Sequence, residues 1–313
     1  MSLLQNSNAI TPVSGFELKS GRFDRGSNAY LSKTPTQDGN LTTWTWSSWF
    51  KLGSQINNGG YQGSLFYWGT NNLDTGGFWG GMLYQDKLNF RYYGSGSPAS
   101  RQIATTQVFR DPSAWYHVTF VSDTTNGTAA DRWRLYINGE RVSNSDMGDT
   151  SYTSMGQGFD QNANGVNSNE TLYISRGILG GGGTQDFDGY QAEVFFVDGS
   201  ALTPASFGET NANTNQWQPK EPKNIKAAVT FGTNGFYLPF SNDALATTFT
   251  DSSSTGHIIT AIAHICFSYS FTINIQTPSI ISVTIVCVRN KCDMIPGTWV
   301  PKYLCCGNLP RCW

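Results

Sequence analysis

The chain has 313 residues, of which 38% are hydrophobic, 14% aromatic and 13% charged, and it contains 34 glycines. This composition is typical of turn-rich, all-β proteins whose surfaces consist of Asn, Ser, Thr and Gln. The net charge of −2 excludes a broad positive surface for nucleic acid. No apolar run approaches the roughly 18 residues that span a bilayer. We therefore expect neither nucleic-acid binding nor membrane insertion.

The N-terminal residues and the cysteines indicate the compartment. Met1 to Asn8 lack the basic and apolar segments of a secretory signal. All six cysteines lie between Cys266 and Cys312, so most of the chain folds without a disulfide. Both features predict a protein made in a reducing cytosol.

The first readable strand is Thr43 to Phe50. Its alternation places Trp44, Trp46 and Phe50 on one face and Trp49 on the other. We expect the first face to meet a hydrophobic core and Trp49 to point outward.

Further short strands follow, separated by clusters of Gly, Asn, Asp and Ser. Gln85-Asp86 is compatible with a tight hairpin, and Asn138-Gly139 is a strong hairpin signal because both residues tolerate positive φ. The strands are predicted at residues 64–68, 81–84, 87–93, 115–121, 132–137, 140–142, 171–175, 190–197 and 235–240.

The stretches between these strands are predicted to be irregular. Residues 143–169 have too little apolar surface for a core of their own, so we expect a long rim loop. Pro204 begins one short helical turn, and residues 211–229 are predicted to be a linker before the returning strand 235–240. Pro239 places that strand at a sheet edge because proline cannot donate to a ladder.

Four segments of the chain carry a family resemblance. They are Tyr30-Leu31-Ser32 with Thr43 to Phe50, Asp111 to Val118, Leu135 to Val142, and Phe187 to Val194 continuing to Pro204. Their order resembles the laminin-G-like, concanavalin A-like jelly-roll family, and especially its members in virion proteins of marine bacteriophages. Two later segments, Phe207 to Thr210 and Gly232 to Phe240, resemble the phage members in particular.

The resemblance implies an all-β fold of two antiparallel sheets packed as a jelly-roll sandwich over residues 1–253. It implies a sheet with a concave outer side, where lectin relatives hold sugars. It also implies a virion protein, on a tail fibre or as capsid decoration, that binds glycans or a host surface, contacts other virion subunits and forms a homo-oligomer. A protein assembled in the cytosol and released by lysis needs neither a signal peptide nor disulfides.

Sugar binding needs an aromatic platform with planar polar side chains beside it. Alternation within the predicted strands directs five such side chains outward. An outward Trp can equally pack under a loop or against another subunit. The candidates are Trp49, Arg91, Tyr93, Arg134 and Tyr136.

Glycoside hydrolase activity is the first alternative, because relatives of this fold include such enzymes. A retaining mechanism needs two carboxylates about 5 to 5.5 Å apart. The one close pair, Asp186 and Asp188, precedes Gly189 at a strand entrance, and strict alternation points Glu193 to the opposite face from Asp188. The single histidine of the sandwich, His117, has no cysteine to pair with. We expect no enzyme activity, and a capsid-stabilising protein without a ligand is the second alternative.

Calcium is the candidate cofactor, because jelly-roll lectin relatives use oxygen ligands at the rim. Ordinary Asx-turn residues in Gly-rich loops are the competing interpretation. The candidate ligands are Asp74, Asp160, Asp186 and Asp188.

Residues 254–313 break the pattern of the rest of the chain. An apolar segment from Ile258 to Phe267 leads into the six cysteines, on a body that has none. We hypothesise a shifted reading frame or a recombination junction near residues 254–258. A small disulfide module, or a zinc site using the tail cysteines with His257 and His264, is the rival explanation.

Overall fold

The computed structural model describes most of the chain, with gaps. The described residues are 18–53, 61–69, 76–94, 100–159, 167–178, 183–241, 248–262, 266–273, 281–285, 287–288 and 291–292.

The first of two antiparallel sheets, sheet A, has the strand order β11-β10-β9-β3-β16-β1-β22-β23, and β19 also pairs with β16. Its strands are β1 (Ser20–Phe23), β3 (Thr43–Leu52), β9 (Trp115–Asp123), β10 (Trp133–Ile137), β11 (Glu140–Arg141), β16 (Gly189–Asp198), β19 (Phe236–Leu238), β22 (Cys266–Ile273) and β23 (Ile281–Ile285).

The second sheet, sheet B, has the order β12-β8-β7-β6-β5-β13-β2-β21-β20, and β4 also pairs with β6. Its strands are β2 (Tyr30–Lys33), β4 (Tyr61–Gly63), β5 (Phe66–Gly69), β6 (Gly76–Tyr84), β7 (Lys87–Gly94), β8 (Ser100–Val108), β12 (Met147–Asp149), β13 (Leu172–Ile174), β20 (Thr248–Thr250) and β21 (Ile258–Ile262).

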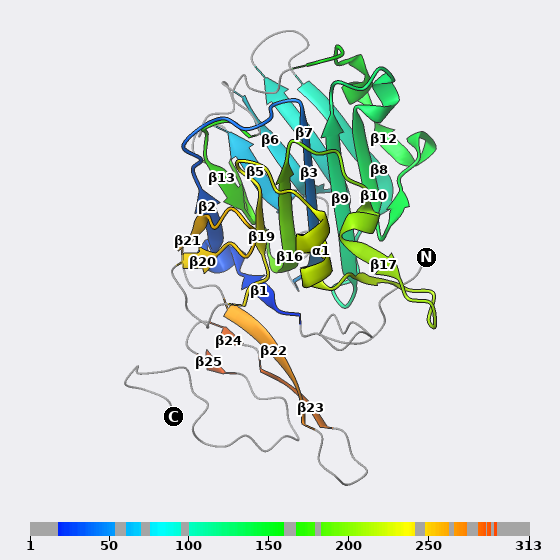
Figure 1. The fold of residues 1–313 in the computed structure, drawn as a ribbon. Helices are drawn as coiled ribbons and strands as arrows, with labels where there is room; N and C mark the ends of the chain where they lie inside the picture. The colour runs from blue at the N-terminus through cyan, green and yellow to red at the C-terminus, as the bar shows by residue number, and fades with distance from the viewer. Residues whose placement is uncertain are drawn as a thin grey trace.

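Shorter elements cross the faces and ends of the two sheets (Figure 1). No helix in the described ranges is long and apolar enough to cross a membrane. These elements are the hairpins β14 (Arg176–Ile178) with β15 (Thr184–Asp186), β17 (Gly208–Thr210) with β18 (Trp217–Pro219), and β24 (Cys287–Val288) with β25 (Lys291–Cys292), and the helix α1 (Pro222–Ala228).

One large aromatic core lies between the two sheets. Trp44 of β3 is fully buried and meets the rings of Phe66 and Phe78 of sheet B edge-on, at centroid distances of 6.5 and 5.2 Å. Trp46 stacks on Phe66 at 4.1 Å. Such pairs stabilise the core beyond the area they bury. The predicted all-β sandwich of antiparallel sheets, with Trp44 and Trp46 in its core, is confirmed.

The two predicted hairpin turns are present. Gln85 and Asp86 have φ values of 52° and 62°, and Asn138 and Gly139 have values of 49° and 85°. Positive φ at both central residues matches the twist of the flanking strands. The first turn therefore adopts this conformation without the glycine that usually favours it.

Two segments predicted to be irregular contain packed structure. Within 143–169, β12 joins the edge of sheet B, and Tyr152 is buried with its ring stacked 5.9 Å from that of Trp133. Within 211–229, β18 and α1 form, and Ile225 of α1 packs into a cluster with Phe195. The predicted rim loop and linker therefore contain short ordered elements, which apolar residues such as Tyr152 and Ile225 attach to the sandwich.

The predicted boundary at residue 253 falls between two strands of sheet B. Strand β21 pairs with β2 on one side and β20 on the other, and its Ile259 is fully buried. Farther on, β22 pairs with β1 through residues 266–268 and extends with β23 away from the sandwich (Figure 1). The hypothesis of a shifted frame stays a prediction. The side chains of His264 and the six cysteines lie outside the described residues.

Candidate functional site

The outer face of sheet A is partly covered by later chain segments. Phe195 and Val197 of β16 point away from the main core and pack with Phe207, Ile225 and Tyr237. Figure 1 shows α1 and β17 lying in front of this sheet. A ligand could reach this part of sheet A only if those segments moved.

Trp49 lies under such a cover. It points away from the main core, as alternation predicted, but it is only 1% exposed. Its ring stacks on His117 at 4.9 Å, and Trp217 of β18 packs against the same cluster. Trp49 is therefore not an open sugar platform, because the β17–β18 hairpin closes over it.

His117 is held between two partners. Its Nδ1 accepts the indole N–H of Trp217 at 2.9 Å, and its Nε2 lies 2.8 Å from Oγ of Ser47. An indole can only donate, so the imidazole proton must be on Nε2 and is donated to Ser47. Burial lowers the pKa of His117 to about 3. The ring is thus a neutral structural group, and it cannot take a proton from Ser47.

The outer face of sheet B carries an aromatic and polar row. The strand register places Ser32, Tyr173, Tyr67, Trp79, Arg91 and Gln102 side by side across β2, β13, β5, β6, β7 and β8. The neighbours of Tyr173 along its strand, Leu172 and Ile174, both belong to the main core. Alternation therefore places Tyr173, and with it Ser32, Tyr67, Arg91 and Gln102, on the outside of the sandwich.

The tyrosines of this face contact one another. Tyr173 lies 5.8 Å from Tyr30 and 6.3 Å from Tyr67 between ring centroids, and Tyr67 is fully buried against Met82 and Ile178. Burial raises the pKa of Tyr67, so its hydroxyl stays neutral. Tyr30 and Tyr173 remain half-buried and present apolar surface outward.

Arg176 lies beside these tyrosines. Its guanidinium carbon is 3.7 Å from the centroid of the Tyr30 ring. Its Nε and Nη2 donate to the two carboxylate oxygens of Asp186 at 2.6 and 2.8 Å. A bidentate pair fixes the plane of a guanidinium. We call the set Tyr30, Tyr67, Tyr173 and Arg176 the tyrosine face.

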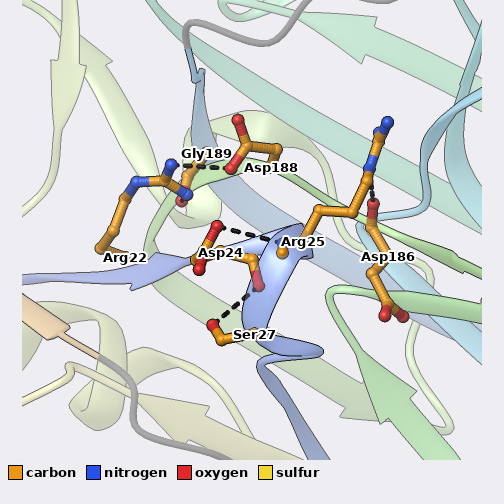
Figure 2. Close-up of polar contacts among 8 residues, drawn as sticks. Arg22, Asp24, Arg25, Ser27, Asp186, Asp188 and Gly189 are labelled. Carbon is orange, nitrogen blue, oxygen red and sulfur yellow. Dashed lines mark hydrogen bonds and ion pairs between the residues drawn. The ribbon is translucent and has the colours of Figure 1, made fainter. Parts of the chain in front are cut away.

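Asp186, the last residue of β15, and Asp188, just before β16, lie beside Arg22 and Arg25 (Figure 2). Arg22 donates to Asp188 at 2.7 Å, and Arg25 donates to the backbone oxygen of Asp186 at 2.8 Å. Both aspartates are almost fully buried. The Asp186 carboxylate pairs with Arg176 and Oδ1 of Asp188 with Arg22, which disfavours both calcium ligation and a pair of catalytic acids.

The other calcium candidates, Asp74 and Asp160, lie outside the described residues. Within the described ranges, no three His, Cys, Asp or Glu side chains come together as a group that could hold a metal ion. A calcium site therefore stays a prediction, and its remaining candidate ligands lie in the rim loops.

The remaining sugar candidates divide between the two sheets. Arg134 and Tyr136 lie half-buried on β10 in sheet A, whereas Arg91 lies on β7 in the row of sheet B. Tyr93 is on β7, but its side chain lies outside the described part. The structure therefore does not bring the five candidates together in one place.

Glu193 lies where alternation fails. It has a φ of 48° at a register shift in β16, so strict alternation from Asp188 does not apply to it. It is 2% exposed, and the hydroxyl of Tyr237 lies 2.9 and 2.8 Å from its two oxygens. Burial raises the pKa of Glu193 to about 8. This acid has no open path to a substrate.

A comparison with protein-family models decides the family. Residues 25–206, more than half of the chain, match the model of the concanavalin A-like lectin/glucanases superfamily. The chain belongs to this superfamily. Among curated proteins no match was found.

Several solved structures are similar to part of the chain. A native heptameric SAP-like pentraxin from Limulus polyphemus is 18% identical with a TM-score of 0.39, over 59% of this chain and 78% of the pentraxin. The LG1-3 region of a laminin alpha2 chain is 16% identical with a TM-score of 0.39, over 56% of this chain and 30% of the laminin. These likenesses concern the fold alone, and the chain spans less than a third of the laminin chain.

A third solved structure is tailspike protein 2 of an Escherichia coli O157:H7 bacteriophage. It is 11% identical with a TM-score of 0.35, over 59% of this chain and 23% of the tailspike. The chain thus spans about a quarter of the tailspike protein.

The tyrosine face was missed by the sequence analysis, although a signal for it exists. Phe66-Tyr67-Trp68 and Leu172-Tyr173-Ile174 each place a tyrosine between two apolar residues. In a strand with its apolar neighbours in the core, that tyrosine must point outward. No local pattern shows that β13, β5 and β2 are neighbours, because residues far apart in the sequence form these pairs.

Proposed function

We propose that this chain is a carbohydrate-binding protein that acts through the tyrosine face. The observation that carries the proposal is the guanidinium of Arg176, held 3.7 Å from the Tyr30 ring beside the half-buried ring of Tyr173. A sugar ring offers a C–H face to an aromatic platform and hydroxyls to planar donors. Nη1 of Arg176 makes no hydrogen bond among the described residues, so it can donate to a sugar hydroxyl.

Polar amides extend the same face. Gln102 donates to the side-chain oxygen of Asn89 at 3.1 Å, and Asn89 donates to the backbone oxygen of Met82 at 3.3 Å. Gln102 stands in the same cross-strand row as Arg91 and Tyr173. The face therefore supports a ligand that extends across several strands, such as an oligosaccharide.

A binding role is favoured over hydrolysis. The two aspartates suggested for catalysis each bind an arginine, and Glu193 is buried against Tyr237. Release of reducing ends from algal or bacterial polysaccharides by the purified chain would revive the hydrolase alternative.

We further propose that the chain is displayed on a virus particle, as part of a tail fibre or as capsid decoration. The support is the resemblance of its ordered segments, from Tyr30 to Phe240, to phage virion proteins. Immunogold labelling of intact particles is the test. Label on the tail or head supports the proposal, and particles without label contradict it.

The test of sugar binding is a glycan array with wild-type chain and two variants. Tyr173→Leu removes the platform and keeps an apolar side chain, so it should lose at least about tenfold in affinity for any glycan that binds. Lys226→Met, on the exposed face of α1, is the matched control and should bind normally. An array without hits, or hits unaffected by Tyr173→Leu, would contradict the proposal and leave a structural role in the particle.

A further inference from the structure

A second row of side chains crosses the outer face of sheet A at one end. The register pairs Arg22 of β1 with Tyr190 of β16, Tyr190 with Lys51 of β3, and Lys51 with Trp115 of β9. Tyr190 and Trp115 pack in a small cluster separate from the main core. The four side chains therefore form one continuous row on the outside of the sheet, which we call the cationic row.

The centre of the cationic row is the Tyr190 ring. The guanidinium carbon of Arg22 lies 5.3 Å from its centroid and Nζ of Lys51 lies 5.9 Å from it. The Trp115 ring is 6.3 Å away. Cations near an aromatic ring are attracted to its face, so the row gathers two positive charges beside two aromatic rings.

Trp115 supplies an independent indication of a ligand. It is 3% exposed, and its Nε1 is buried without an acceptor in the described part of the chain. An indole nitrogen can only donate, and buried donors are nearly always paired. The missing group is therefore a hydrogen-bond acceptor.

Two carboxylates lie near the row. Asp188 pairs through Oδ1 with Arg22 of the row itself at 2.7 Å, and its buried Oδ2 has no hydrogen-bond partner in the described part of the chain. Asp111, which is close enough to Lys51 to affect its pKa, accepts at Oδ1 from the backbone N–H and the hydroxyl of Ser113 at 2.8 and 2.6 Å. Neither carboxylate bonds to the indole of Trp115. An incoming oxyanion could accept from Trp115 while it faces Lys51.

The extent of the row limits the size of the ligand. The next row on the same face, Ala192, Trp49 and His117, is closed by Trp217. Arg22 and Tyr190 remain half-buried at the other side of the row. Because Lys51 and Trp115 are buried, a ligand would approach over the half-buried Arg22 and Tyr190.

We propose that the cationic row is a second binding site, for a saccharide that carries a carboxylate or sulfate oxygen. The acidic group accepts from the Trp115 indole and lies beside Lys51, and the sugar ring contacts Tyr190. This site is distinct from the tyrosine face, which we propose binds uncharged sugar rings and hydroxyls.

The test is calorimetric titration with a uronate trisaccharide, its sulfated counterpart and the neutral trisaccharide of the same linkage. Trp115→Phe removes the N–H donor and keeps an aromatic ring, and it should weaken binding of the acidic sugars about tenfold. Lys51→Met should weaken it similarly and reduce its dependence on salt. Lys226→Met removes the same charge from exposed α1 and should have no effect. Near-ultraviolet circular dichroism checks the fold, and if Lys51→Met does not fold, Trp115→Phe alone decides.

The outcomes separate this proposal from the function proposed above. Tyr173→Leu should leave binding of the acidic trisaccharides at the cationic row unchanged. Absence of acidic-sugar binding to wild type, equal affinity in Trp115→Phe and Lys51→Met, or binding of a poly-glutamate peptide in place of the sugars would each overturn the proposal.

Discussion

Trp217 donates its indole N–H to Nδ1 of His117 across 2.9 Å, and this bond fastens the β17–β18 hairpin to the outer face of sheet A. Two glycines make room for the indole. A Cβ on Gly139 or Gly208 would lie 2.6 or 2.5 Å from the Trp217 ring. The glycine of the Asn-Gly turn thus serves the packing of Trp217 as well as the turn itself.

Substituting Trp217→Phe should lower the free energy of unfolding by about 1 to 3 kcal/mol. The ring contacts largely remain, but Nδ1 of His117 loses its donor and stays buried, which costs that much for an unsatisfied polar group. Urea denaturation followed by circular dichroism measures the change. An unchanged unfolding midpoint would show that the bond does not hold the hairpin.

Glu193 should make the free energy of unfolding depend on pH. Its pKa rises from 4.5 to about 8 on burial, so the folded state keeps a proton that the unfolded state releases between these values. Stability from this group is complete below pH 4.5 and is lost as the pH rises through about 8. Glu193→Gln should reduce the fall in unfolding free energy between pH 5 and pH 8.

The control for this prediction is an exposed acid. Glu140→Gln changes the same group on β11, where the side chain is exposed, and should leave the pH profile as in wild type. Equal profiles for wild type and Glu193→Gln would refute the assignment of a protonated Glu193.

Removal of Arg176 should destabilise the sandwich more than removal of an exposed arginine. In Arg176→Met the buried carboxylate of Asp186 loses its bidentate partner, at a cost of about 3 kcal/mol. Arg141→Met breaks the exposed pair with Asp131 and should cost under about 1 kcal/mol. Thermal unfolding of both variants gives the comparison. Similar melting temperatures would mean that the Arg176–Asp186 pair does not stabilise the fold.

Truncation should show where the sandwich ends. A chain that stops at residue 262 keeps β21, its ladders to β2 and β20, and the buried Ile259, whereas a chain that stops at 253 loses them. Burial of one such side chain contributes about 1.5 to 3 kcal/mol. The longer chain should therefore be clearly more resistant to urea. Equal stability would place the end of the folding unit at 253.

The fold was predictable from the sequence, but much of the site was not. Alternation in β3 correctly placed Trp44 and Trp46 in the core and Trp49 outside it, because side chains in a strand alternate regardless of context. The cover over Trp49 comes from Trp217, far along the chain, and no local pattern reports it. Alternation also failed at Glu193, because the register shift in β16 has no signature in the residues themselves.

The tyrosine face shows the same limit. Each tyrosine could have been placed on an outer face from its own strand, yet the meeting of Tyr30, Tyr173 and Tyr67 depends on β2, β13 and β5 being neighbours. The ion pair of Arg176 with Asp186 joins two strands of one hairpin. Asp186 was suggested as a calcium ligand because the sequence does not show that an arginine lies opposite it.

The most direct test of the central claim is a crystal structure of the chain with the best glycan from the array. We predict a sugar ring against Tyr173 with a hydroxyl accepting from Nη1 of Arg176. A sugar bound only at the rim loops, with the tyrosine face empty, would contradict the claim.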